Sequence, residues 1–412
     1  MRNLFKIAVR NLMRYKRRTS LTVSLISIGV VFVLVFISVS GSFKNMMIGQ
    51  ITDSLVGHIQ VHRKGYLAAT ENMPLDLNLE FSEFNQLKNT LGKQSEIEAY
   101  SPRIKLGGML SNFVATSNIS LIAVYPGMEF KTLPLLPSKI INGAKKFNRG
   151  EIIIPELLAE GMNIKAGNVV VVVATNKDGS VNGKQFKVAG IVERLFGPSG
   201  RNGYMHIEDA AELLRMEEIE VNEVAIRLKN FDMLNPMNQK LEKLLSKELS
   251  PQGKPLFEVH TWEKLTPFST IARMIDVMTF FIKLMLTAIV LISIMNVMIM
   301  AVYERIREIG TIAAIGTLPG KILSMFIIEG LCLGVAGVAI GNIMGMLIIF
   351  IINSLRFTFN FGMQTGLLLS AKIHPADLFS IFVTVIIVSI IASLEPAFKA
   401  SKMEPIKALR HI

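Results

Sequence analysis

Four long stretches of the chain contain no charged residue, and they are unevenly spaced. These uncharged runs cover residues 19–43, 284–303, 330–355 and 378–394. A helix needs about 20 apolar residues to cross about 30 Å of hydrocarbon, so each run predicts a membrane-spanning helix. The pattern therefore predicts one span, then a large insert of ordinary mixed composition, and then three further spans.

The element boundaries follow from these runs and their flanking polar residues. The four spans are placed at residues 19–43, 274–303, 322–353 and 378–395. The other segments are an amphipathic interfacial helix (1–18), the large extracytoplasmic domain (44–273), a coupling helix and loop (304–321), a short external loop (354–377) and a tail (396–412).

The N-terminal segment has the pattern of a helix that lies on the membrane surface, over residues 2–15. Arg2, Lys6, Arg10 and Arg14 recur at helical spacing, and Leu4, Ile7, Ala8 and Leu12 cover another side. A basic segment that only sets the topology is the alternative. Apolar stripes also extend the first span to Leu55 and begin the second at Phe268. Both predict stalk helices, with ordinary core helices of the insert as the alternative.

The insert has mostly strand patterns. Strands are predicted at 58–62, 119–124, 169–173, 185–192 and 223–228, with a hairpin turn at 176–180 and helices at 208–216 and 233–248. The Gly- and Pro-rich stretch 197–203 is interpreted as a connecting loop. Together these elements predict an α+β domain of mixed sheets.

The net charge of +12 follows the membrane pattern. Nearly all of the excess of Lys and Arg lies before the first span, between the second and third, and after the fourth. Positive residues stay on the cytoplasmic side, so both termini are expected inside and the large insert outside. This topology explains the charge without a nucleic-acid partner. The first span is interpreted as a retained anchor because its apolar run is longer than that of a signal peptide.

Motifs for catalysis or cofactor binding are lacking in the sequence. None of the Gly-Lys pairs is followed by Ser or Thr, so no phosphate-binding loop is present. Cys332, the one cysteine, is interpreted as an apolar filler of the third span. His58 and His62 alternate on one predicted strand, but two histidines without a third ligand make a weak metal site. We therefore expect no catalytic residue, no metal and no directly bound cofactor.

The third predicted span contains glycines at close to four-residue spacing and one carboxylate. The glycines are Gly330, Gly334, Gly337, Gly341 and Gly345. Such a stripe predicts close packing against a neighbouring helix. Glu329 lies well inside the span, where a carboxylate is a candidate for function. It is expected to pair with an Arg or Lys from another helix, and a proton-coupling role lacks a second acidic partner.

The segment between the second and third spans reads as a charged helical continuation of the second span, followed by a turn at Pro319-Gly320. Its sequence, ERIREIGTIAAIG, places Ile309, Ile312, Ala313 and Gly316 on one face. The residues expected to couple to a partner are Glu304, Arg305, Arg307, Glu308, Ile309, Gly310, Ile312, Ala313 and Gly316.

This segment resembles the FtsX/MacB/LolCE group of ABC transporter permeases. The similarity extends to Glu329-Gly330, to the N-terminal AVRNLMRYKRRT and to the C-terminal EPAFKASKMEPIKALR, in the same order as the one-plus-three layout of spans. The stretch GHIQVHRKGY resembles lipoprotein-releasing permeases of the LolC/LolE type. MacB-like proteins carry a fused nucleotide-binding domain, which is not expected in this chain, so the chain departs from that pattern.

The resemblance implies a non-catalytic permease of a bacterial inner membrane. Two cytoplasmic ABC ATPase subunits, which bind ATP and Mg²⁺, would bind the 304–316 helix, and a second copy or a sister permease would complete the membrane part. The implied cargo is an acylated lipoprotein that is handed to a periplasmic carrier. The alternatives are MacB-like efflux of another cargo and FtsX-like signalling to a cell-wall hydrolase. An intramembrane enzyme is disfavoured because no nucleophile or acid–base pair is present.

Overall fold

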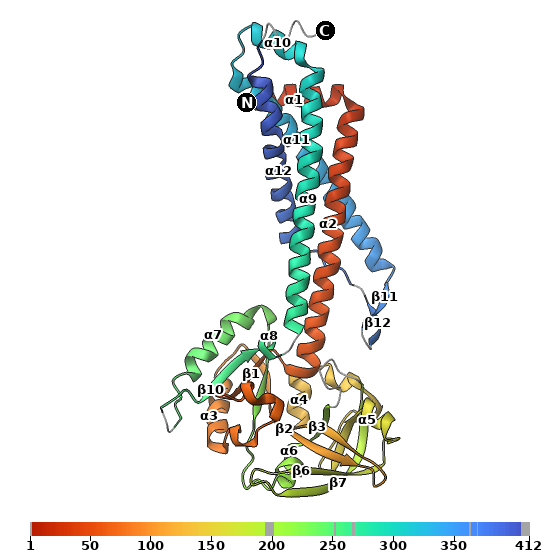
Figure 1. Cartoon of the computed structure of the whole chain (residues 1–412), viewed down its shortest axis with the longest axis vertical. Coiled ribbons are helices and arrows are strands. Elements are labelled where there is room, and N and C mark those ends of the chain that lie inside the picture. Colours follow the sequence, from red (N-terminus) through yellow and green to blue (C-terminus); the bar gives the residue numbers. More distant parts are fainter. Residues whose placement is uncertain are drawn as a thin grey trace. The chain divides into compact units, whose positions relative to one another are not determined.

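The computed structural model describes residues 2–193, 202–250, 253–265, 268–361, 364–368 and 370–404. The chain forms two compact units (Figure 1). The membrane unit comprises Met1–Asn45 and Ala272–Ile412, and the inserted domain comprises Met46–Ile271. The bounds of the inserted domain differ from the predicted 44–273 by two residues at each end.

Helices make up nearly all of the membrane unit. They are α1 (Arg2–Arg14), α2 (Lys16–Ile51), α9 (Phe268–Glu304), α10 (Ile306–Ala314), α11 (Pro319–Ser354) and α12 (Pro375–Ser401), with a hairpin of β11 (Thr358–Phe361) and β12 (Gln364–Leu368). Four helical segments are long and apolar enough to cross a membrane, namely Lys16–Val56, Ser269–Glu304, Pro319–Ser354 and Pro375–Ser401. The predicted four spans are therefore confirmed.

Each spanning helix is longer than its uncharged run. The first helix continues past the run as far as Ile51 and ends in a π-helical turn, Thr52–Val56. The second begins at Phe268, well before the run at 284–303. Intrahelical hydrogen bonds do not require apolar side chains, so a helix that is nucleated in the hydrocarbon region continues into polar sequence. The uncharged run therefore identifies the apolar part of each helix but does not identify the residues at which the helix begins and ends.

The inserted domain is built on one large mixed sheet of ten strands. Its strands are β1 (Ile59–Arg63), β2 (Ile97–Ser111), β3 (Thr116–Val124), β4 (Ile140–Gly143), β5 (Glu151–Pro155), β6 (Val169–Thr175), β7 (Val181–Val192), β8 (Asn202–His206), β9 (Glu223–Leu228) and β10 (Phe257–Thr261). The order is β10-β1-β9-β2-β3-β8-β5-β7-β4, and β6 pairs with β2 and β7. The predicted α+β class is confirmed.

Short helices accompany this sheet. They are α3 (Phe81–Gly92), α4 (Pro126–Thr132), α5 (Glu156–Gly161), α6 (Ile207–Leu213), α7 (Leu234–Leu245) and α8 (Trp262–Leu265), with 3-10 turns at Leu67–Asn72, Leu75–Leu77, Leu136–Lys139 and Phe231–Met233. In α7 the buried side chains recur at helical spacing, and they are Leu234, Met237, Leu241 and Leu245. The helix predicted at 233–248 therefore corresponds to α7, which buries one apolar face.

Two sequence interpretations of the insert can be compared with the structure. The valine run and its return strand form an antiparallel hairpin, in which Thr175 pairs with Val181 across the predicted turn. The predicted loop at 197–203 falls mostly outside the described residues, but its last two residues, Asn202 and Gly203, begin β8. A Cβ on Gly203 would lie 2.7 Å from the Ile153 carbonyl oxygen, so this glycine allows two strands to approach closely.

A buried arginine organises the centre of the inserted domain. Arg103 of β2 is fully buried, and its Nη1 lies 2.6 Å from Glu223 Oε1 while its Nη2 lies 2.8 Å from Glu129 Oε1. Lys105 pairs with the second oxygen of Glu223. Burial acts to raise the pKa of Glu223, but Lys105 and Arg103 hold that pKa far below its usual range. The cluster is thus a set of paired charges that joins β2, α4 and β9.

Candidate functional site

The segment between α9 and α11 does not continue α9 as the sequence indicated. The α9 helix ends at Glu304, and α10 begins at Ile306. Arg305 lies between them with φ −112° and ψ 16°, outside the helical region. The predicted continuous helix is therefore wrong at one residue, and that residue is the one whose side chain turns inward.

Arg305 forms a buried ion pair with Glu329. Its Nη1 lies 2.9 Å from Glu329 Oε1, and the two side chains are 5% and 2% exposed. Asn11 of α1 donates from Nδ2 to the same Oε1 over 2.7 Å. The Arg305 guanidinium carbon lies 5.6 Å from the ring centre of Phe326, which is fully buried. Glu329 thus has the basic partner that the sequence led us to expect, and that partner is Arg305.

Neighbouring carboxylates favour the charged form of Arg305. Burial acts to lower the pKa of Arg305, but Glu329 and Glu308 outweigh burial, so the pKa is raised. Breaking a buried pair on one side is costly because it leaves an uncompensated charge. The arrangement is therefore a fixed connection between α1, the start of α10 and α11. We call Asn11, Arg305 and Glu329 the buried node.

A second layer of ion pairs lies outside the buried node. Arg18 Nη1 lies 2.6 Å from Glu304 Oε2, and Arg14 Nη1 lies 3.1 Å from Glu308 Oε1. Glu308 also accepts from Arg305 Nε over 3.1 Å through its other oxygen. Two of the residues predicted to meet a partner, Glu304 and Glu308, therefore contact basic residues of the chain's own N-terminal helices.

The faces of α10 are unequal in exposure. Ile306, Ile309 and Gly310 are buried within the membrane unit, whereas Ile312 and Ala313 are half-buried. Ile309 belongs to the apolar core of the helix bundle. A substitution at Gly310 would thus disturb the bundle itself as well as any docking. Arg307 lies on the exposed side.

Gly316 does not share the α10 face with Ile309. It follows the end of the helix with φ +95°, and its N–H binds the Ala313 carbonyl while Thr317 N–H binds the Ile312 carbonyl. This is a Schellman motif, in which a left-handed residue ends a helix and glycine adopts that conformation at little cost. Gly316 therefore ends α10, and the exposed residues after the helix include Ile315 and Leu318.

The glycines of α11 approach two different helices. A Cβ on Gly330 or Gly334 would meet Ser393 or Ser389 of α12 at 2.7 Å and 2.0 Å. The remaining three face α2, where a Cβ would meet Ile26 (from Gly337), Val30 (from Gly341) and Leu34 (from Gly345) at 2.5 to 2.7 Å. The stripe therefore lets α11 pack closely between α12 and α2.

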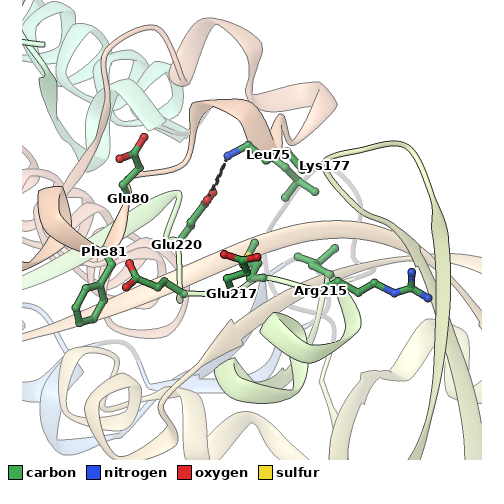
Figure 2. A pocket seen from close by; sticks show the side chains of 10 residues that line it. Leu75, Glu80, Phe81, Lys177, Arg215, Glu217 and Glu220 are labelled. Atoms are coloured by element: carbon green, nitrogen blue, oxygen red, sulfur yellow. Dashed lines mark hydrogen bonds and ion pairs between the residues drawn. The ribbon is translucent and has the colours of Figure 1, made fainter. Parts of the chain in front are cut away.

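One surface pocket of the inserted domain combines acidic, basic and apolar side chains. It has a volume of about 400 Å³, and its lining includes Glu80, Glu217 and Glu220 (Figure 2). Lys177 Nζ pairs with Glu220 Oε2 over 3.0 Å, the dashed contact in Figure 2. Its lining contains no Ser, Cys or His, so no nucleophile and base meet there.

The two histidines of the predicted strand have different surroundings. His58 precedes β1, and its Nδ1 accepts the Leu228 N–H over 3.0 Å while its Nε2 lies 3.6 Å from Asp53. His62 lies beside Tyr66 and Glu223 instead. They therefore form no common ligand set with each other. His62 also adjoins Glu258 and His260 of β10, which lie far away in the sequence.

Four helices long and apolar enough to span a membrane, with a large α+β insert after the first, define a polytopic membrane protein. Residues 19–244 match the family model described as the MacB-like periplasmic core domain, which covers more than half of the chain. Residues 280–405 match the FtsX-like permease C-terminal model. The chain belongs to the ABC transporter permeases of the LolC/MacB/FtsX type.

Three relatives show how the similarity is distributed. The chain is 24% identical to the lipoprotein-releasing system transmembrane protein LolC of Neisseria meningitidis, over 95% of this chain and 94% of that protein. It is 24% identical to the macrolide export ATP-binding/permease protein MacB of Salmonella paratyphi A, over 96% of this chain but 58% of MacB. The uncharacterized ABC transporter permease MJ1507 of Methanocaldococcus jannaschii is 26% identical, over 60% of this chain and 58% of that protein.

Two solved structures align with about half of the chain. The periplasmic region of MacB from Actinobacillus actinomycetemcomitans aligns at 16% identity with a TM-score of 0.36, over 55% of this chain and 95% of that one. The extracellular domain of the ABC-type transporter YknZ aligns at 14% identity with a TM-score of 0.34, over 49% of this chain and 99% of that one.

Proposed function

We propose that this permease extracts acylated lipoproteins from the outer leaflet of a bacterial inner membrane. In this proposal, a separate cytoplasmic ABC ATPase supplies the energy and a periplasmic carrier receives the cargo. The observation that best supports this proposal is the similarity to LolC over nearly the full length of both proteins. Neither chain has a large unmatched segment. Lifting an acyl chain out of the bilayer costs about 0.8 kcal/mol per CH₂, which explains the need for nucleotide energy.

In the proposed mechanism, a movement of the ATPase subunits is transmitted to the membrane unit through α10. Two ATPase subunits would contact the exposed side of this helix, and the permease would act as a pair, with a second copy or a sister subunit. The buried node supports this role because it connects α10 to α1 and α11 through charged contacts. A displacement of α10 would therefore move α11 as well, because the ion pair connects the two helices directly.

The proposed topology places α10 and both termini in the cytoplasm and the inserted domain in the periplasm, as the positive-inside pattern indicates. Cys332 is the one cysteine, so Cys332→Ser gives a chain without thiols. New single cysteines at Asp178 and Ile315, both exposed, would then report the side of each unit. A membrane-impermeant maleimide added to intact spheroplasts should label Asp178→Cys and spare Ile315→Cys. The reverse pattern would contradict the topology.

Depletion of the permease tests the cargo. We expect mature lipoproteins to accumulate in the inner membrane, measured by membrane fractionation. A mild-detergent purification should recover the ATPase, any sister permease and trapped acylated protein together. Normal lipoprotein sorting after depletion would contradict the lipoprotein proposal while leaving the permease class intact.

A second candidate is export of another cargo, as the name of the MacB relative suggests. It is favoured by the equal identity of 24% over 96% of this chain. Depletion would then leave lipoproteins sorted normally and raise the sensitivity of the cells to exported compounds.

A further inference from the structure

Three potential metal ligands share one face of the β1–β10 pair in the inserted domain. In this antiparallel pair, His62 lies directly opposite Glu258 and Gln60 lies opposite His260. Opposite residues share a face, and so do residues two apart on one strand. The register therefore brings His62, Glu258 and His260 together, although 196 residues separate the first from the second in the chain.

Donor atoms of the three side chains lie close enough to converge on one ion. One ring nitrogen of each histidine and a carboxylate oxygen of Glu258 all lie within 4.8 Å of one another. Glu258 Oε2 is 3.6 Å from His260 Nε2. Rotations of the part-exposed Glu258 and His260 side chains would suffice to close this arrangement around an ion with bonds of about 2.0 to 2.2 Å.

Two ring nitrogens in this cluster lack a hydrogen-bond partner among the described residues. His62 is 1% exposed, and its Nδ1 has no hydrogen-bond partner within the described part of the chain. Over the same residues, His260 Nδ1 is also buried without a hydrogen bond, while His260 Nε2 lies 3.6 Å from the Glu258 carboxylate. Buried polar atoms are nearly always satisfied, so unpaired nitrogens on one face call for a ligand.

Glu223 orients the ring of His62. His62 Nε2 lies 3.5 Å from Glu223 Oε2. A carboxylate beside one ring nitrogen fixes the orientation of the ring and leaves the other nitrogen, here Nδ1, as the electron donor.

We propose that His62 Nδ1, His260 and Glu258 bind a divalent transition-metal ion, with Zn²⁺ as the preferred ion. Two imidazoles and one carboxylate form a known zinc ligand set that leaves a fourth position for water, whereas Mg²⁺ and Ca²⁺ prefer oxygen ligands throughout. The ion can enter because β10 is an edge strand and the side chains of His260 and Glu258 are 14% and 15% exposed. The bound ion joins the first strand of the domain to the last.

The test uses the full-length protein, purified in detergent and stripped of metal with a chelator. Co²⁺ is the probe because its visible absorption reports four-coordinate binding. We expect one Co²⁺ per chain, displaced by Zn²⁺. His260→Ala and Glu258→Gln should each weaken binding at least about tenfold. The matched control is His374→Ala, since His374 is an exposed histidine of the membrane unit and should leave affinity unchanged.

Trp262, the one tryptophan, reports whether each variant is folded. It is 2% exposed, lies in the inserted domain and directly follows β10. Zn²⁺ should raise the unfolding temperature read from its fluorescence in the wild type and not in His260→Ala. The proposal is overturned if the wild type binds no stoichiometric Co²⁺, or if a folded His260→Ala variant retains full affinity. These outcomes do not depend on the cargo of the permease.

Discussion

Arg305 Nη1 lies 2.9 Å from Glu329 Oε1, and the two side chains are 5% and 2% exposed. Arg305 is the residue at which the helical path breaks between α9 and α10, and Glu329 lies in the buried face of α11. The break in the helix and the ion pair therefore occur at the same residue.

We expect Arg305→Gln to destabilise the membrane unit by about 3–5 kcal/mol, because Glu329 would remain buried without its cation. The measurement is thermal unfolding in detergent, followed by helical circular dichroism. Arg18→Gln is the matched control, since Arg18 pairs with the more exposed Glu304, and it should cost no more than about 1 kcal/mol.

A double variant separates the ion pair from simple loss of side-chain packing. Glu329→Gln alone should also be costly, whereas Arg305→Gln combined with Glu329→Gln should cost less than the sum of the two single changes. Additive effects would show that the two residues do not interact in the folded protein.

Gly337→Ala should destabilise the helix bundle by about 1–3 kcal/mol through overpacking. The added Cβ would lie 2.5 Å from Ile26 Cγ2 and 2.7 Å from Ile26 Cβ, and the β-carbon cannot move away without the backbone of α2. Gly41→Ala, in α2, is the control because nothing lies within 4 Å of its added Cβ. It should stabilise by up to about 1 kcal/mol through helix propensity. Equal melting temperatures would contradict the close approach of α11 to α2.

Arg103→Met should destabilise the inserted domain by about 3–5 kcal/mol, because Glu129 and Glu223 would be left buried with fewer partners. Denaturant unfolding, read from Trp262 fluorescence, measures this domain specifically. Arg149→Met is the control, since Arg149 is 59% exposed beside Glu208 and Glu212 and should cost no more than about 1 kcal/mol.

The inserted domain should lose stability in acid, and Glu258 contributes to this loss. Its pKa falls from 4.5 to about 2 on folding, so the stabilisation is complete above pH 4.5 and is lost as the pH falls toward 2. Unfolding followed by Trp262 fluorescence across this range should show a shallower pH dependence in Glu258→Gln than in the wild type. Val114→Ala, a change at an apolar side chain that is 93% exposed, should keep the wild-type slope.

Ile315→Asp should reduce co-purification of the proposed ATPase several-fold without changing the melting temperature. Ile315 is 81% exposed at the end of α10, so a charge there leaves the bundle intact but disfavours an apolar contact. Leu355→Asp makes the same change at the other end of α11, where Leu355 is 61% exposed, and should leave co-purification intact. Unchanged recovery with Ile315→Asp would argue against docking at this position.

The sequence predicted elements whose signal is local. Uncharged runs identified the four spans, and five consecutive valines with a following turn identified β6 and its hairpin. The long strand β2 was missed because Pro102, Gly107 and Gly108 suggest a break. In the folded domain a Cβ on Gly108 would lie 2.7 Å from the Val173 carbonyl oxygen. The glycine therefore allows β2 to approach β6 closely, and only the tertiary structure reveals this contact.

Sites formed by residues that are far apart in the sequence were harder to predict. Glu329 was recognised as needing a cation, but its partner Arg305 was expected to lie within a continuous helix. His62 was identified, while Glu258 and His260 were not, because β10 is a strand of only five residues, although its buried and half-buried positions alternate. The pairing register that brings them together depends on the whole sheet and cannot be read from either segment alone.

The strands through which the chain enters and leaves the inserted domain are neighbours, with Ile59 paired to Thr261. Paired strands are about 4.7–4.9 Å apart, so the whole insert has the geometry of a cassette with adjacent ends. Replacing such a cassette changes the spacing of the helices at its two attachment points very little. Evolution can therefore exchange the inserted domain, and with it the specificity, while the membrane unit is retained.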